Sequence, residues 1–184
     1  MTRMAVAETA SAPRAMGITV HTGWGACVVV GGSSEHPEIL ANTLIEVLGK
    51  DERFCYHAAA EMSLGAAKSC LEQLRQRALL SAKQELARVS AQTAPSAMLC
   101  AIVAKPGDPG DLGHVLASHP RLHAAEGCFY RDIFRDACGV PVRIIPPSSL
   151  DISRVGKVTI HPWGRDQKLA AVAAWSLLFR SFVS

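Results

Sequence analysis

The segment HAAEGCFYRDIFRDAC, residues 123–138, carries an acidic side chain where the pattern calls for an apolar one. At 100° per residue, Glu126 falls on the same helix face as Leu122, Phe129 and Ile133. Burying an unpaired carboxylate is costly, so a glutamate here must be paired, neutral or at the rim of a cleft. Glu126 is therefore a candidate general base or metal ligand. The alternative is a structural carboxylate paired with a lysine, an arginine or backbone N–H groups.

Two further candidates lie at the ends of expected elements. Asp166 opens the Ala-rich stretch DQKLAAVAAW, where it is either a ligand, an anionic partner of His21, or a residue that balances the helix dipole. His21 follows an alternating strand pattern and is either an acid, a base or ligand, or a hydrogen-bonded core histidine. Ligands gather beyond the carboxyl ends of parallel strands. We therefore expect a cleft where the first strand ends at His21 and the fourth at Lys105.

The expected cleft is lined by acidic, basic and imidazole side chains. We assign catalysis to Glu126, Asp166 and His21, and a metal ion to Glu126, Asp166 and Asp108. Substrate contacts are expected from Lys105, Lys168 and Trp163. The lysines would hold a phosphate and the indole would stack on a base or sugar. The alternatives are ordinary surface lysines and a hydrophobic plug before the last helix.

The remaining chemistry-bearing residues match no motif. His114, His119 and His123 cluster around Pro120, but their spacing is not that of a common metal site. Six cysteines occur without a CxxC pair, which predicts a reduced protein with cysteines used as small core residues. GxSxG, HExxH, phosphate-loop and dinucleotide fingerprints are missing, so covalent catalysis has no support.

Composition predicts one globular domain. The chain has 184 residues, 49% of them hydrophobic and 5% aromatic, and a net charge of +3. This charge allows a basic groove without requiring a nucleic-acid partner. Residues 1–15 lack the apolar core of a signal peptide and are expected to form a flexible leader to a domain over 16–184. The apolar run 169–179 is shorter than the about 20 residues that span a bilayer. We expect a soluble, cytoplasmic protein that does not enter membranes.

The elements that must position the candidates follow from periodicity and breakers. Strands are expected at residues 17–22, 26–30 and 39–48 as an antiparallel meander, although 17–30 also reads as one long bent strand. A helix is expected at 58–89 and a buried strand at 98–104. A short helix at 111–118, the helix 123–138, a strand at 140–145 and one or two helical turns at 148–155 follow. A last helix covers 165–182. This order predicts an α/β fold with a mixed sheet, three antiparallel strands and then parallel ones, flanked by helices.

The predicted order resembles the ribonuclease H-like fold, and within it the RuvC-type resolvases. The stretch TGWGACV, residues 22–28, is similar to the glycine-containing first hairpin of that group. The acidic start of DQKLAAVAAW is similar to that of their last helix. The segments HAAEG and PWGRDQK resemble those of uncharacterised bacterial proteins.

The resemblance implies a hydrolase that acts on a phosphate-containing or nucleic-acid substrate with a divalent metal such as Mg²⁺. Two-metal chemistry needs several carboxylates around ions about 4 Å apart. The first strand, GITVHTG, has none, and the fourth, MLCAIVA, is followed by none until Asp108. The alternative is a non-catalytic module of degenerate ribonuclease H-like fold that binds a protein or nucleic acid. Either form is compatible with a homodimer through the apolar sheet edge or the last helix.

Overall fold

The computed structural model describes residues 13–33, 35–93, 98–155 and 162–179. The first strand begins at Arg14, so it includes two residues that we had expected in the leader. The rest of the leader, residues 1–12, and the C-terminal end expected for the last helix lie outside the described residues.

Five strands form one mixed sheet in the order β3-β2-β1-β4-β5. The strands are β1 (Arg14–His21), β2 (Trp24–Gly32), β3 (Pro37–Glu46), β4 (Met98–Val103) and β5 (Val142–Ile145). Strands β1, β2 and β3 pair antiparallel, whereas β4 runs parallel to β1 and β5 parallel to β4. The predicted fold class is confirmed. The bent-strand alternative is wrong, because a tight turn at Gly23 (φ +86°) folds β2 back onto β1.

The helices follow the predicted order, but one expected helix is divided in two and several boundaries differ. They are α1 (Cys55–Ala60), α2 (Leu64–Gln92), α3 (Leu112–Leu116), α4 (His119–Ala137) and α5 (Arg165–Phe179), with short 3₁₀ turns at Pro147–Ser149 and Ile152–Arg154. The single helix expected at 58–89 is divided, because the Ser63 hydroxyl accepts a hydrogen bond from the Ala66 N–H and starts a new helix. Helix α4 starts at His119, since Pro120 is tolerated in a first helical turn.

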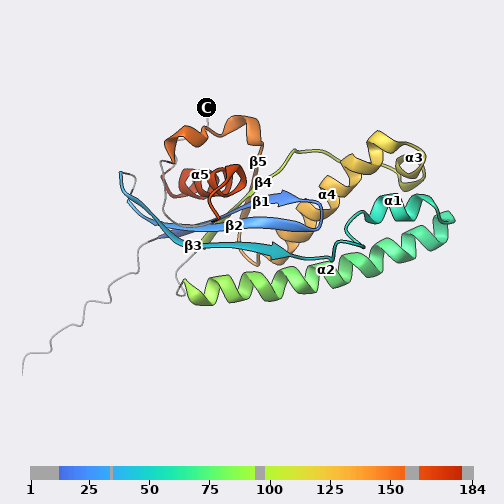
Figure 1. Ribbon diagram of the computed structural model, residues 1–184, viewed down its shortest axis with the longest axis horizontal. Helices are drawn as coiled ribbons and strands as arrows, with labels where there is room; N and C mark the ends of the chain where they lie inside the picture. The colour runs from blue at the N-terminus through green and yellow to red at the C-terminus, as the bar shows by residue number, and fades with distance from the viewer. Residues whose placement is uncertain (1–12, 34, 94–97, 156–161, 180–184) are drawn as a thin grey trace, which may run out of the picture.

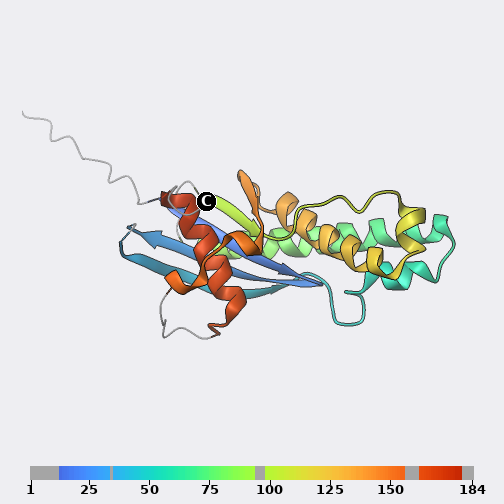
Figure 2. The ribbon, with the colours of Figure 1, turned by 90° about the horizontal axis from the view of Figure 1, so that it is seen from above.

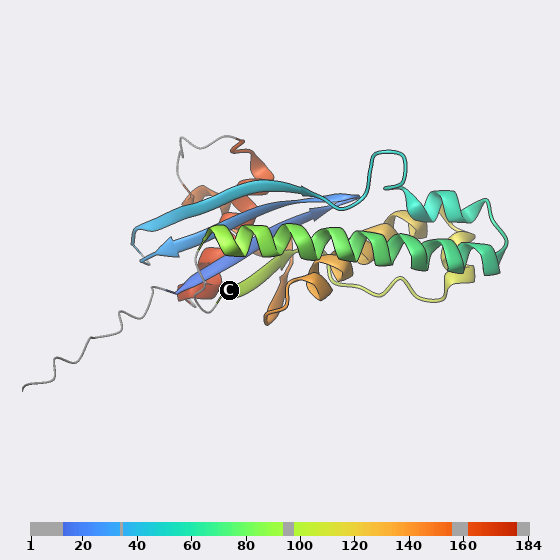
Figure 3. The ribbon, with the colours of Figure 1, turned by 90° about the horizontal axis from the view of Figure 1, so that it is seen from below.

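The helices form two layers around the sheet (Figure 1). Helix α5 lies across one face (Figure 2), and α2 runs along the other (Figure 3). Alternation along β1 sets the faces: Met16 and Ile18 belong to the core under α2 and α4, whereas Ala15 packs with α5. Gly17, Thr19 and His21 therefore share the α5 face. Helices α1 and α3 and the start of α4 gather beyond the sheet, at the projecting end of α2.

No described helix is both long and apolar enough to cross a membrane. Strands β3 and β5 form the two edges of the sheet. The homodimer stays a prediction, and so does the cytoplasmic location.

Gly17 is where α5 approaches the sheet most closely. A Cβ built there would lie 1.8 Å from the Ala170 carbonyl oxygen, a backbone atom that cannot turn aside. Gly17→Ala should therefore lower the free energy of unfolding by about 3 kcal/mol or more.

Gly127→Ala is the matched control, because that glycine is exposed on α4 with nothing within 4 Å of a new Cβ. It should be neutral or stabilising by about 0.5–1 kcal/mol. Urea unfolding of both variants makes the comparison, and equal effects would contradict the close packing.

Candidate functional site

His21 and Asp166 meet at the carboxyl end of β1. His21 Nε2 lies 3.1 Å from Asp166 Oδ1, with the two side chains 39% and 31% exposed. The two atoms are close, but His21 Nε2 makes no hydrogen bond as the ring lies, so the imidazole must turn to donate its Nε2–H to the carboxylate. The Thr19 hydroxyl donates a hydrogen bond of 2.9 Å to the Asp166 backbone carbonyl, which ties the first turn of α5 to β1. Of the alternatives for Asp166, this distance agrees with an anionic partner of His21, and its place in the first turn of α5 agrees with the helix-dipole role.

The pair can act as a carboxylate-oriented base. A neutral imidazole that donates from Nε2 keeps Nδ1 as a proton acceptor. The carboxylate of Asp166 favours that tautomer, because it places a negative charge beside Nε2.

Trp24 extends this group across the sheet. It is the register partner of His21, and the two rings stack with centroids 4.3 Å apart and planes 11° apart. Glu46 is the next register partner, on β3. Stacking limits the rotation of the imidazole, which keeps its free nitrogen in a defined direction. No sequence motif had pointed to a role for Trp24.

A cavity of about 150 Å³ adjoins Trp24. Gly23, Trp24, Leu44, Glu46, Leu48, Lys50 and Arg53 line it. The Arg53 Nε is buried without a hydrogen-bond partner, and a buried guanidinium nitrogen of this kind suits an anion. The volume is below the roughly 300–1,000 Å³ of pockets for drug-sized ligands, so it suits a phosphate group rather than a whole nucleoside.

Glu126 lies in a different part of the molecule. Its side chain is 1% exposed, and Oε1 accepts a hydrogen bond of 2.9 Å from Nδ1 of His57, on α1. Oε2 has no hydrogen-bond partner and lies 4.0 Å from His123 Nδ1. The expectation that this carboxylate must be paired is confirmed, but its partner is His57, which was not among the predicted site residues.

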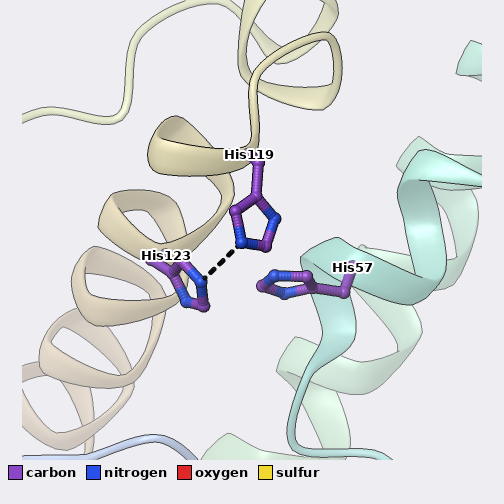
Figure 4. Close-up of side chains that lie close together, drawn as sticks. All are labelled: His57, His119 and His123. Atoms are coloured by element: carbon purple, nitrogen blue, oxygen red, sulfur yellow. Dashed lines mark hydrogen bonds between the residues drawn. The ribbon is translucent and has the colours of Figure 1, made fainter.

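Three imidazoles gather beside Glu126. His57 points from α1 toward His119 and His123 of α4 (Figure 4), and the Nε2 atoms of His119 and His123 lie 3.2 Å apart. One possible ligand atom from each of the three lies within 4.8 Å of the others. His114 does not join them; it lies near Asp111, with its side chain 78% exposed.

Lys105 and Asp108 lie on the exposed loop after β4. The Lys105 carbonyl accepts a hydrogen bond from Arg131, which also binds the Gly107 carbonyl and Asp132. The Asp108 carboxylate accepts a hydrogen bond from the Gly110 N–H. Arg131 therefore anchors the loop. The Asp108 carboxylate stabilises the turn of this loop. These contacts bring no second carboxylate beside it that could share a metal ion.

The residues around the start of α5 divide between core and surface. Trp163 is partly buried and packs against the core between α5 and the sheet, as the plug alternative expects. The Asn42 side-chain amide donates a hydrogen bond of 2.7 Å to the carbonyl of Pro162, the residue before Trp163. Lys168 is half-buried, two positions after Asp166. Lys168 is therefore near Asp166 in the sequence. Trp163 has a packing role.

The structure separates the single expected cleft into two groups. His21 and Asp166 belong to the α5 face of the sheet, and Glu126 belongs to the helical layer on the other face. The carboxylates expected to hold Mg²⁺ each have different partners: His21 for Asp166, His57 for Glu126 and the Gly110 amide for Asp108. This donor set does not fit two hard cations about 4 Å apart.

The cysteines of the described residues are free thiols, four of them buried. Burial raises the pKa of Cys55 to about 12, and the negative charge of Glu126 adds to the effect. Burial raises the pKa of Cys27 as well. Thiols held protonated in this way are poor nucleophiles, which agrees with the predicted use of cysteine in the core.

The comparisons with known proteins concern the fold. The chain matches no protein-family model, and no curated protein sequence matches it. The structure is similar to RuvC of T. thermophilus in complex with a Holliday junction substrate, with a TM-score of 0.51, 12% identity, and coverage of 91% of this chain and 94% of that one. A second Thermus thermophilus RuvC structure gives a TM-score of 0.47 and 11% identity, with 91% and 95% covered. The first of these similarities shows the ribonuclease H-like fold that RuvC has, as the resemblance implied.

The buried pair of His57 and Glu126 can be tested by stability. In metal-free protein at pH 7, His57→Ala leaves a carboxylate that is 1% exposed without its hydrogen-bond donor. The free energy of unfolding should fall by about 2–4 kcal/mol. Adding Glu126→Gln should restore part of that loss, because no buried charge is then left. His114→Ala is the control and should change stability by less than about 0.5 kcal/mol. Urea unfolding with a chelator present makes the measurement, and additive losses in the double variant would argue against the pair.

Proposed function

We propose that this protein is a nuclease-like hydrolase that acts on a phosphate-containing substrate, nucleic acid foremost, at the His21–Asp166 pair. The observation that carries the proposal is the 3.1 Å approach of His21 Nε2 to Asp166 Oδ1 at the carboxyl end of β1. In sheets of this kind ligands bind beyond the carboxyl ends of the strands. The similarity to RuvC supports the choice of nucleic acid, because that RuvC was solved with a Holliday junction substrate.

The chemistry proposed for the pair is general-base catalysis. Once the His21 imidazole has turned toward Asp166, the carboxylate accepts its Nε2–H, so Nδ1 is free to take a proton from a water molecule. The water oxygen attacks phosphorus, the bond to the leaving oxygen breaks, and solvent supplies the proton that the leaving oxygen needs. Lys50 and Arg53 line the adjacent cavity, where their charges suit the phosphate oxygens. Lys168 is a further candidate contact to phosphate. Glu126 has no part in this step, because it faces His57.

The second candidate is a non-catalytic module that binds nucleic acid through the same surface. It is favoured by the residue types at the strand ends. On the α5 face, β1 ends in Thr19 and His21, and β4 ends in Val103, so neither strand brings a carboxylate to Asp166. A phosphate ligand would then bind to the basic residues of the cavity without being hydrolysed.

Cleavage assays separate the two candidates. Branched and linear DNA and RNA are incubated with the whole chain, with and without Mg²⁺. We expect cleavage that His21→Ala and Asp166→Asn each lower by about 10²–10⁴-fold, with little change in binding. His114→Ala should cleave like the unmodified protein. Binding without cleavage would favour the non-catalytic module, and the failure of all these nucleic acids to bind would contradict both candidates.

The cavity residues can be tested through the salt dependence of binding. Lys50→Gln with Arg53→Gln should weaken nucleic-acid binding for every sequence tested. The slope of log K against log salt should become shallower by about one for each phosphate that is no longer neutralised. Lys83→Gln, exposed on α2, is the control and should leave the slope unchanged. Fluorescence anisotropy at several salt concentrations makes the measurement. An equal effect from Lys83→Gln would show that only net charge matters.

A further inference from the structure

We propose that His57, His119 and His123 form a binding site for a late first-row divalent metal ion, Zn²⁺ foremost. Glu126 would orient the ligands from behind. This site lies where α1 meets the start of α4, beyond the sheet, so it is separate from the His21–Asp166 pair (Figure 1). The inference therefore does not rest on the proposed hydrolase activity.

The distances are close to those of a metal site. Zn–N bonds of about 2.0–2.1 Å in a tetrahedral site place the ligand nitrogens about 3.3 Å apart. His119 and His123 Nε2 already lie 3.2 Å apart. One nitrogen of His57 completes a group within 4.8 Å, and its ring faces the other two in Figure 4. Metal binding requires this nitrogen to move closer to the other two.

The local structure explains why these three side chains converge. His119 and His123 are four residues apart on α4, so they project from the same side of consecutive turns. Helix α1 is held against α3 and α4 by a small apolar core of Val115, Leu122 and Ala125. That packing brings the His57 ring within 4.6 Å of the His123 ring and 5.2 Å of the His119 ring, between centroids.

Glu126 is an independent observation that points to a cation. Its Oε1 accepts the Nδ1–H of His57, which leaves Nε2 of that ring to face the group. Its Oε2 is buried without a hydrogen-bond partner, 4.0 Å from Nδ1 of His123. A carboxylate behind ligating histidines is the usual arrangement in zinc proteins, where it sets the tautomer and the ring direction. A metal ion in front would also compensate the buried negative charge.

The donor atoms indicate which class of metal ion the site would bind. Three imidazole nitrogens suit Zn²⁺, Ni²⁺ or Cu²⁺, whereas Mg²⁺ and Ca²⁺ prefer oxygen ligands. His123 has 57% of its side chain exposed and His57 27%, so one side of the group is open to solvent. A fourth coordination position is therefore available for water or an anionic ligand.

The test uses Co²⁺ and Zn²⁺ alone with the whole, reduced chain. We expect one Co²⁺ per chain with a tetrahedral visible spectrum, displaced by Zn²⁺, and without the sulfur-to-metal absorption that cysteine ligands would give. His119→Ala and His123→Ala should abolish this spectrum. Glu126→Gln should keep it but weaken metal affinity by about 10–100-fold. Circular dichroism checks that each variant is folded.

His114→Ala is the matched control, because this exposed histidine precedes α4 without joining the group. It should bind metal as the unmodified chain does. No tetrahedral Co²⁺ spectrum from the unmodified protein would overturn the proposal. So would an equal loss in His114→Ala, or a spectrum dominated by sulfur ligands. None of these outcomes depends on whether nucleic acid is cleaved.

Discussion

The contact between β1 and α5 is the constraint on which the proposed catalytic site depends. Gly17 has no Cβ, so the backbone of α5 at Ala170 can lie directly on the strand. Two residues along β1 cover about 6.6 Å, and four residues of helix cover about 6 Å. The step from Gly17 to Thr19 therefore matches the step from Ala170 back to Asp166, and the Thr19–Asp166 hydrogen bond is the result. The next residue of β1 on this face is His21, which meets the Asp166 carboxylate.

The same alternation separates the two groups of titratable residues. Odd-numbered positions of β1 face α5, and even-numbered ones face the core under α2 and α4. Asp166 belongs to the first layer and Glu126 to the second. The described residues thus bring together no cluster of carboxylates of the kind that two-metal chemistry requires. They form instead a histidine–carboxylate pair at the sheet and a histidine group at the projecting helices.

Much of the fold could be predicted from the sequence because periodicity and breakers are local signals. The strands, the long helix and the Asp166 helix follow from them. The sequence offered the pairing of His21 with Asp166 only as one of several alternatives. Glu126 was predicted to need a partner, but His57 was missed because it lies in α1, a six-residue helix too short to show a periodic pattern. Trp24 and Arg53 were missed for a related reason. Their roles come from cross-strand register and from a cavity, which depend on tertiary contacts that no short window of sequence contains.

The proposed catalytic pair requires Asp166 to hold His21 in one tautomer, with its proton on Nε2 and Nδ1 free. Nitrogen-15 NMR of the histidine side chains tests this most directly, at a pH where His21 is neutral. We predict the Nε2–H tautomer for His21 and its loss in Asp166→Asn. A His21 signal from the Nδ1–H tautomer, or one that does not change in Asp166→Asn, would contradict the claim.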